Sequence, residues 1–230
     1  YGEEIYTVKA GESATLSTGD KVTATIDTKV KNVGDSAEGN NTVTALVIEN
    51  ESEYPIVQTV AGTLTITRRP VTITAASAAK EYDGTALVKN SYTSTGLAQG
   101  DSIASVRITG TVTEVGSVQN IPAAAKIVDG TEDVTANYSI TYVDGTLQVT
   151  PGTNSIIVTI VENSGTYVYD GLEHVLSGYT VSISEALYSE KDFAFSGDAK
   201  VRGTDAGTYE MELTADMFKN TNPNFSNVEF

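Results

Sequence analysis

The chain contains no cysteine and no tryptophan, and its 230 residues include one histidine and two methionines. Because cysteine is absent, the chain cannot form a disulfide, a thiolate nucleophile or a thiolate metal site. The single histidine, His174, could complete a catalytic triad only beside a positioned nucleophile, and the chain has no Gly-x-Ser-x-Gly sequence. We therefore predict that this protein is not an enzyme.

Basic residues are also scarce. The 14 Lys and Arg residues stand against 30 Asp and Glu residues, which gives a net charge of −16. A surface that binds nucleic acid needs clustered Lys and Arg, and the one basic doublet here is Arg68-Arg69. We expect no nucleic-acid partner, and we interpret the acidity as a source of solubility and mutual repulsion along an exposed protein.

Long apolar runs are missing too. No stretch approaches the roughly 18 apolar residues of a transmembrane helix, so we expect no membrane insertion in this fragment. The sequence opens on Tyr1 and shows no signal peptide or lipidation motif at either end. We interpret it as part of a longer polypeptide whose targeting and anchoring signals lie elsewhere.

Repetition is the main feature of the residues that are present. Tyr82-Asp83-Gly84 returns as Tyr169-Asp170-Gly171, 87 residues later, and Asn137-Tyr138-Ser139 returns as Asn224-Phe225-Ser226 at the same spacing. Self-similarity at a fixed period indicates an array of like modules. Such arrays usually provide reach and multivalency rather than chemistry.

Two further matches place the first part of the chain in the same register. Val33-Gly34 aligns with Val115-Gly116, and Gly62-Thr63-Leu64 aligns with Gly145-Thr146-Leu147. The chain therefore reads as three copies of one unit.

The repeat predicts three domains. Residues 1–67 are a first repeat that lacks its first strand, residues 70–150 are a complete middle repeat, and residues 154–230 are a last repeat that lacks its last strand. Pro70 and Pro151 stand in short junctions, and proline stiffens the backbone. We therefore expect an elongated array with little flexibility between the repeats.

Alternation of apolar and polar residues predicts strands. It is clearest in Val71-Thr72-Ile73-Thr74 and in residues 105–113, 138–142 and 147–150, and no segment has a sustained helical period. The fold class is predicted to be all-β, each repeat being a small Ig-like antiparallel β-sandwich of about seven strands. Asp144-Gly145 lies between two alternating runs and predicts a hairpin there.

The Tyr-Asp-Gly motifs are interpreted as structural. In both Tyr82-Asp83-Gly84 and Tyr169-Asp170-Gly171, the Asp side chain can bond the local backbone and the glycine tolerates a positive φ. The tyrosine ring is expected at the edge of the core with its hydroxyl in water. Loss of Gly84 or Gly171 is expected to harm folding and not ligand binding.

The incomplete outer repeats would expose strand edges. Three explanations remain open. The ends of the fragment truncate the outer repeats, or the folding unit begins at the Tyr-Asp-Gly motif. In the third explanation, the outer repeats of different molecules complete each other by strand exchange.

The middle repeat carries a family resemblance. The residues concerned are the opening Pro70-Val71-Thr72-Ile73-Thr74, the Tyr82-Asp83-Gly84 motif, the Asn137-Tyr138 step and the closing residues 145–150. This combination resembles the YDG and mostly-β, glycine-rich (MBG-like) Ig-like repeats of bacterial cell-surface proteins and proposed adhesins. The resemblance implies an extracellular β-rich array at the cell surface or cell wall of a bacterium, and it brings no catalytic residues.

Calcium is the one cofactor that the residues suggest. Hard oxygen ligands from loops suit calcium in extracellular arrays. Asp129, Glu132 and Asp133 form the best local cluster of such ligands, although no Asp-x-Asp-x-Asp-Gly loop is present. We name these three residues as the candidate metal site and expect no other cofactor.

The sequence favours an adhesin module or a stalk that projects a binding end from the cell. Its partners would be neighbouring repeats of the same polypeptide and a host glycoprotein, matrix or glycan ligand. Spacer repeats of a large secreted or surface enzyme are the alternative, and a carbohydrate-binding module comes third. Tyr54, Tyr92, Tyr179 and Tyr188 are candidate ligand contacts, for each of which packing is the competing role.

Overall fold

The computed structural model describes residues 12–27, 30–51 and 57–230. Tyr54 lies outside them. The described residues form β-strands and short 3-10 turns without an α-helix, so the predicted all-β class is confirmed. In this part of the chain, no helix has the length and apolar character needed to cross a membrane.

The chain divides into two compact units. Unit 1 comprises Tyr1–Thr74, Thr93–Arg107 and Pro122–Val143, and unit 2 comprises Ala75–Tyr92, Ile108–Ile121 and Asp144–Phe230. Each unit holds three separate segments of residues 70–150. The domain boundaries drawn from the repeat stay a prediction.

Unit 1 contains two three-stranded sheets. The first has the order β1-β2-β3, formed by β1 (Ser13–Thr15), β2 (Lys21–Asp27) and β3 (Thr42–Ile48). The second has the order β10-β4-β6, formed by β10 (Tyr138–Val143), β4 (Arg69–Ala75) and β6 (Tyr92–Thr95). The short 3-10 turns are η1 (Val33–Asp35) and η3 (Thr135–Asn137). Val71 and Ile73 of β4 are fully buried, which matches the alternation that predicted this strand.

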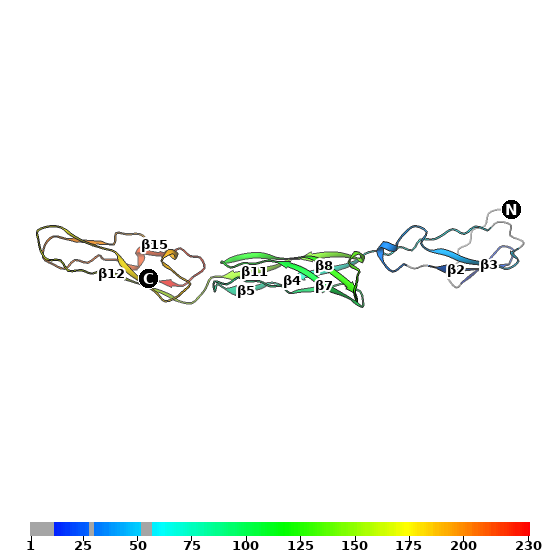
Figure 1. Ribbon diagram of the computed structural model, residues 1–230, viewed down its shortest axis with the longest axis horizontal. Helices are drawn as coiled ribbons and strands as arrows, with labels where there is room; N and C mark the ends of the chain where they lie inside the picture. Colours follow the sequence, from blue (N-terminus) through cyan, green and yellow to red (C-terminus); the bar gives the residue numbers. More distant parts are fainter. Residues whose placement is uncertain (1–11, 28–29, 52–56) are drawn as a thin grey trace. The chain divides into compact units, whose positions relative to one another are not determined.

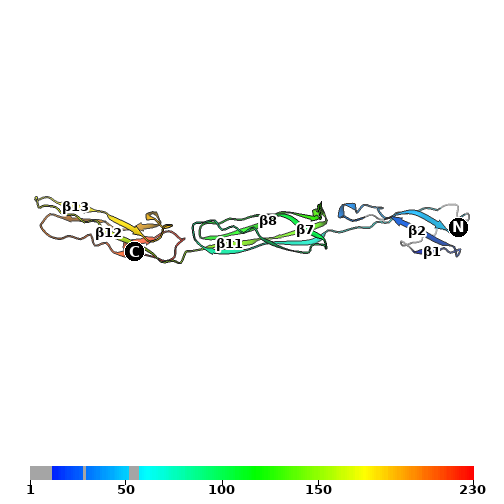
Figure 2. The same cartoon turned by 60° about the horizontal axis from the view of Figure 1, so that its bottom comes forward.

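A five-stranded sheet runs through the middle of the sequence. Its order is β5-β11-β8-β7, formed by β5 (Ala78–Glu81), β11 (Gly145–Thr150), β8 (Gly116–Asp129) and β7 (Asp101–Thr109), and β9 (Glu132–Asp133) pairs with the end of β8. Figure 1 labels β5, β11, β8 and β7, coloured from teal to yellow-green, and Figure 2 labels β11, β8 and β7 from a second direction. Leu147 and Val149 of β11 are fully buried.

The rest of unit 2 consists of shorter sheets around an aromatic core. β12 (Ile156–Glu162) lies between β14 (Tyr179–Ile183) and β18 (Val228–Glu229), β13 (His174–Ser177) pairs with β16 (Lys200–Gly203), and β15 (Phe193–Phe195) pairs with β17 (Phe218–Asn220). The 3-10 turns are η4 (Glu190–Asp192) and η5 (Ala215–Met217). The buried core consists of Ile156, Val158, Tyr188, Phe193, Phe218 and Phe225.

The sequence predicted antiparallel pairing throughout, and this prediction is wrong for three pairs of strands. β10 and β4, β11 and β5, and β12 and β18 are parallel pairs. Parallel strands need a long crossover between them, and in each of these pairs more than 60 residues separate the two strands. Local alternation reports which face of a strand is buried, but it does not report the direction of its neighbour.

The predicted hairpin at Asp144-Gly145 is wrong. β10 pairs with β4, whereas β11 pairs with β5 and β8, so the two strands on either side of Asp144 belong to different sheets. The pairing register is kept across the step, since Val143 pairs with Thr74 and Leu147 with Ala78. Gly145 allows two backbone segments to approach each other closely here, because an added Cβ would lie 2.5 Å from Ala76 O.

Gly145→Ala is expected to destabilise the middle repeat by about 1–3 kcal/mol, because a methyl group would meet the backbone of Ala75 and Ala76. The matched control is Gly165→Ala, where the nearest atom to an added Cβ is a leucine methyl at an ordinary 3.5 Å. Urea denaturation with hydrogen exchange measured along β11 gives the comparison. Equal midpoints for the two variants would contradict the close-approach explanation.

Candidate functional site

The turn after β5 is the middle YDG turn (Tyr82-Asp83-Gly84). Asp83 Oδ1 accepts hydrogen bonds from Thr85 N–H at 2.9 Å and from Lys80 Nζ at 2.5 Å. Gly84 has a φ of +74°, the left-handed region that favours glycine. The hydrogen bond from Lys80, followed by those from Thr85, holds the pKa of Asp83 well below its ordinary value.

The last YDG turn (Tyr169-Asp170-Gly171) has the same local geometry. Asp170 Oδ1 accepts a hydrogen bond from Leu172 N–H at 2.9 Å, and Gly171 has a φ of +80°. That backbone hydrogen bond, followed by the nearby His174, lowers the pKa of Asp170. The two turns therefore share one aspartate-to-backbone hydrogen bond and one left-handed glycine.

The two turns differ in what covers them. The Tyr82 ring meets the Phe225 ring edge to face, with 5.3 Å between the centroids, and burial raises the pKa of the Tyr82 hydroxyl. An added Cβ at Gly84 would lie 3.1 Å from a methyl group of Leu187. Phe225 and Leu187 both belong to the predicted last repeat, so the middle YDG turn packs against the repeat that follows it.

A second contact lies beside this turn. Asn224, only 5% exposed, accepts a hydrogen bond at Oδ1 from Val115 N–H at 2.8 Å. Its Nδ2 donates to the carboxylate of Glu114. One amide side chain thus engages both a backbone donor and a side-chain acceptor of the middle bend (Glu114-Val115-Gly116).

The same arrangement recurs between the first and middle predicted repeats. Asn137 Oδ1 accepts a hydrogen bond from Val33 N–H at 2.8 Å, and Asn137 Nδ2 donates to Asn32 Oδ1 at 2.7 Å. Asn32 and Val33 belong to the first bend (Asn32-Val33-Gly34). The first bend itself is held by Asp35, whose Oδ2 accepts from Asn32 N–H at 2.8 Å.

We call each of these arrangements an asparagine clasp: the amide of Asn137 on the first bend, and the amide of Asn224 on the middle bend. Their four components align in the repeat register, since Val33 matches Val115 and Asn137 matches Asn224. Two contacts built from aligned residues indicate one mode of joining.

The sequence held a signal for the clasps that its interpretation did not use. In the sequence, Asn137 and Asn224 mark the repeat, and Val33-Gly34 aligns with Val115-Gly116. The Val-Gly step and the asparagine recur together from repeat to repeat. This co-occurrence is the signal that could have linked the asparagine to the bend. What the sequence does not contain is the distance between them, since Val33 and Asn137 are separated by 104 positions.

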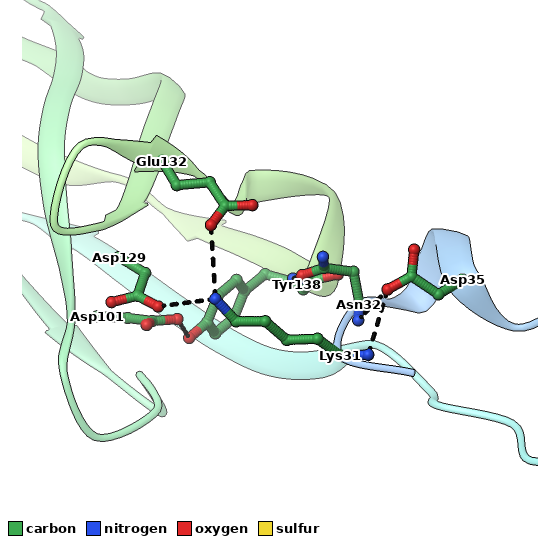
Figure 3. A network of polar contacts seen from close by, with 8 residues as sticks. Lys31, Asn32, Asp35, Asp101, Asp129, Glu132 and Tyr138 are labelled. Carbon is green, nitrogen blue, oxygen red and sulfur yellow. Dashed lines mark hydrogen bonds and ion pairs between the residues drawn. The ribbon is translucent and has the colours of Figure 1, made fainter. Parts of the chain in front are cut away.

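The candidate metal site lies near the first clasp, at the end of β8. Figure 3 shows the Lys31 side chain reaching Asp129 and Glu132, with Nζ at 3.2 Å and 3.4 Å from their carboxylate oxygens. Asp133 Oδ1 accepts from Thr135 N–H at 3.0 Å. Among the described residues, no three His, Cys, Asp or Glu side chains are arranged to hold a metal ion. Calcium binding by Asp129, Glu132 and Asp133 stays a prediction.

The tyrosines named as candidate ligand contacts serve packing where they are described. Tyr188 is buried, and burial raises its pKa to about 12. Tyr179 meets the rings of Phe195 and Phe218, each at 5.3 Å, and Tyr92 is half-buried in β6. Among the residues that the structure describes, the exposed tyrosines are others: Tyr142, Tyr167, Tyr169 and Tyr209.

Asn137→Ala and Asn224→Ala are each expected to weaken one clasp by about 1 kcal/mol, because a backbone N–H and a second polar group lose their partner. Hydrogen exchange should quicken about tenfold at Val33 N–H in the first variant and at Val115 N–H in the second. Asn90→Ala is the matched control, since Asn90 is exposed. Unchanged exchange at both valines would contradict the clasp.

A calcium ion at Asp129 and Glu132 would have to displace the Lys31 ammonium group. Lys31→Met is therefore expected to raise calcium affinity severalfold, with the starting chain no tighter than roughly the millimolar range of weak extracellular sites. Lys89→Met removes the same charge elsewhere and is the control. Identical calorimetric titrations of Lys31→Met and Lys89→Met would count against calcium at this cluster.

Comparison with known proteins yields one match. No curated protein and no solved structure is significantly similar to the chain. Residues 71–148 match the family described as MBG domain (YGX type). Domains of this family occur in surface proteins. The resemblance read from the sequence is thereby confirmed for residues 71–148, which match the model of this family.

Proposed function

We propose that this chain is a run of tandem Ig-like repeats in an extracellular bacterial surface protein, where it acts as a stalk or adhesin module that projects a binding end from the cell. The family match of residues 71–148 supports a repeat of a bacterial surface protein. The observation that carries the more specific proposal is the recurrence of the asparagine clasp at two successive joins.

The clasp supports the stalk because it limits bending. A hydrogen bond is directional, and each clasp has two of them on one short side chain. Asn has only two side-chain torsions to immobilise, so holding it costs little entropy compared with a Lys or Glu. At the second join, the Tyr82–Phe225 ring contact adds apolar burial beside the clasp.

The surroundings of the linker support the same conclusion. Gly152 N–H donates to Asn224 O at 2.9 Å, and Ser226 N–H donates to Gly152 O at 3.1 Å. The linker glycine is thus paired with the segment that carries the clasp. A linker whose backbone is hydrogen-bonded on both sides is expected to act as part of the fold and not as a tether.

If the chain is an adhesin module, its ligand contacts are expected to come from exposed aromatic residues. Tyr167 and Tyr169 are 52% and 67% exposed, and the Tyr167 ring stacks on His174 at 4.6 Å. A screen of the chain against mucins, matrix proteins and a glycan array, with calcium and with chelator, separates the two roles. Reproducible binding of a ligand would show that the repeats are adhesive. Absence of binding to every molecule in the screen would favour the stalk.

Small-angle X-ray scattering is expected to give a radius of gyration of about 30 Å, the value for three repeats of roughly 30–40 Å each placed end to end. A compact globule of this length would give about 17 Å. The double variant Asn137→Ala with Asn224→Ala should broaden the distance distribution as the joins loosen, and Asn90→Ala should not. A radius near 17 Å would overturn the stalk.

A further inference from the structure

The middle YDG turn and the middle bend, which contact the last repeat, each have a counterpart within the last repeat. Tyr82, Asp83 and Gly84 correspond to Tyr169, Asp170 and Gly171. The middle bend corresponds to a last bend (Asp205-Ala206-Gly207). Strand pairing supports this second match, because Leu87 bridges Val112 just before the middle bend and His174 pairs with Gly203 just before the last bend.

We propose that the last YDG turn and the last bend together form a docking face for a further repeat of the same type, which would seat an Asn-Tyr or Asn-Phe step there. The inference rests on the proposed function, because it takes the asparagine clasp as the general join between repeats. The face would receive the Asn amide at Ala206 N–H and the aromatic ring at Tyr169.

The last YDG turn already has the geometry of its occupied counterpart. The last YDG turn has the Asp170–Leu172 hydrogen bond at 2.9 Å, equal to the Asp83–Thr85 bond in the turn that is occupied. In the bend, Asp205 corresponds to Glu114, whose carboxylate accepts from the Asn224 amide. A repeat that docks here would therefore meet a counterpart of both the apolar and the polar half of the contact.

The last YDG turn is also uncovered, unlike its occupied counterpart. Tyr169 is 67% exposed and Leu172 66%, whereas Tyr82 is mostly covered by Phe225 and its neighbours. An added Cβ at Gly171 would meet no atom within 4 Å, against the Leu187 contact at Gly84. Ala206 is exposed, and its N–H has no partner among the described residues.

The occupant is a repeat with an Asn followed by an aromatic residue. Both such steps in this chain are engaged, Asn137 on the first bend and Asn224 on the middle bend. A second copy of this chain therefore has no free clasp to offer unless one of its own joins opens. A further repeat in the same polypeptide meets the requirement without that loss.

The test lengthens the protein in register. A second copy of residues 144–230 is added after Phe230, which places a counterpart of β11 and then a whole new Asn224-Phe225 step behind the last repeat. Hydrogen exchange at Ala206 N–H is expected to slow at least about tenfold relative to the original chain, as it acquires the acceptor that Val115 N–H has. The slowing should be lost when Asn224→Ala is made in the added copy only.

Two controls separate docking from other effects. A chain extended by residues 144–150 alone supplies the strand without the next repeat, and it should leave Ala206 exchange unchanged. If that short extension slows Ala206 as much as the long one, strand completion and not docking is responsible, and the proposal is overturned. Slow exchange at Ala206 in the original chain at high concentration, paired with dimerisation, would also overturn it in favour of a second copy.

Val115 N–H serves as an internal reference in every chain. Protection at Val115 with none at Ala206 in the extended chain overturns the docking face alone. Fast exchange at Val115 as well overturns the clasp and, with it, the proposed function.

A second measurement applies if the long extension melts too early for exchange measurements. In that chain Tyr169→Ala is expected to lower the melting temperature of the added repeat by several degrees, and Tyr167→Ala is not. Equal effects of the two substitutions would overturn the proposal.

Discussion

The two joins depend on a requirement that an amide side chain meets and other short polar side chains do not. Each bend presents a backbone N–H that needs an acceptor and, one residue earlier, an oxygen that needs a donor. Asn carries an acceptor and a donor on one short side chain. An aspartate at position 224 would set two carboxylates against each other at Glu114, and a serine could not span both groups.

The requirement also explains why the partner groups of the clasp differ between the joins. The backbone N–H of Val33 or Val115 is constant in both, while the second acceptor is an amide oxygen at Asn32 and a carboxylate at Glu114. The backbone group is independent of side-chain identity, so the bend tolerates sequence change. Repeats of varied sequence can thus use one join, which suits a long array.

How far the sequence predicted the fold depended on the range of the interaction. Strand positions followed from alternation, because Val71 and Ile73 of β4 and Leu147 and Val149 of β11 face the core at period two. The turn chemistry of Asp83 and Gly84 was also local and readable. The pairing of β10 with β4 was not, since strand direction is set by partners about 70 positions away.

The wrong hairpin prediction has a physical cause of the same kind. Asp144-Gly145 reads as a hairpin because Asp-Gly favours that turn, yet Gly145 is required by the backbone of Ala75 and Ala76 across the sheet. The acidic cluster at Asp129 and Glu132 also has a distant partner, because Lys31, about 100 positions earlier, donates hydrogen bonds to both carboxylates. Neither partner is visible in the local sequence.

The central claim is that the Asn224 amide couples the last repeat to the middle bend, and a double-mutant cycle tests it most directly. The cycle compares the free energies of unfolding of Asn224→Ala, Glu114→Ala and the double variant with that of the unchanged chain. We expect a coupling free energy of about 1 kcal/mol, because the bond from the amide to the carboxylate is charge-assisted but lies at a partly exposed edge. Strictly additive effects of the two substitutions would contradict the account.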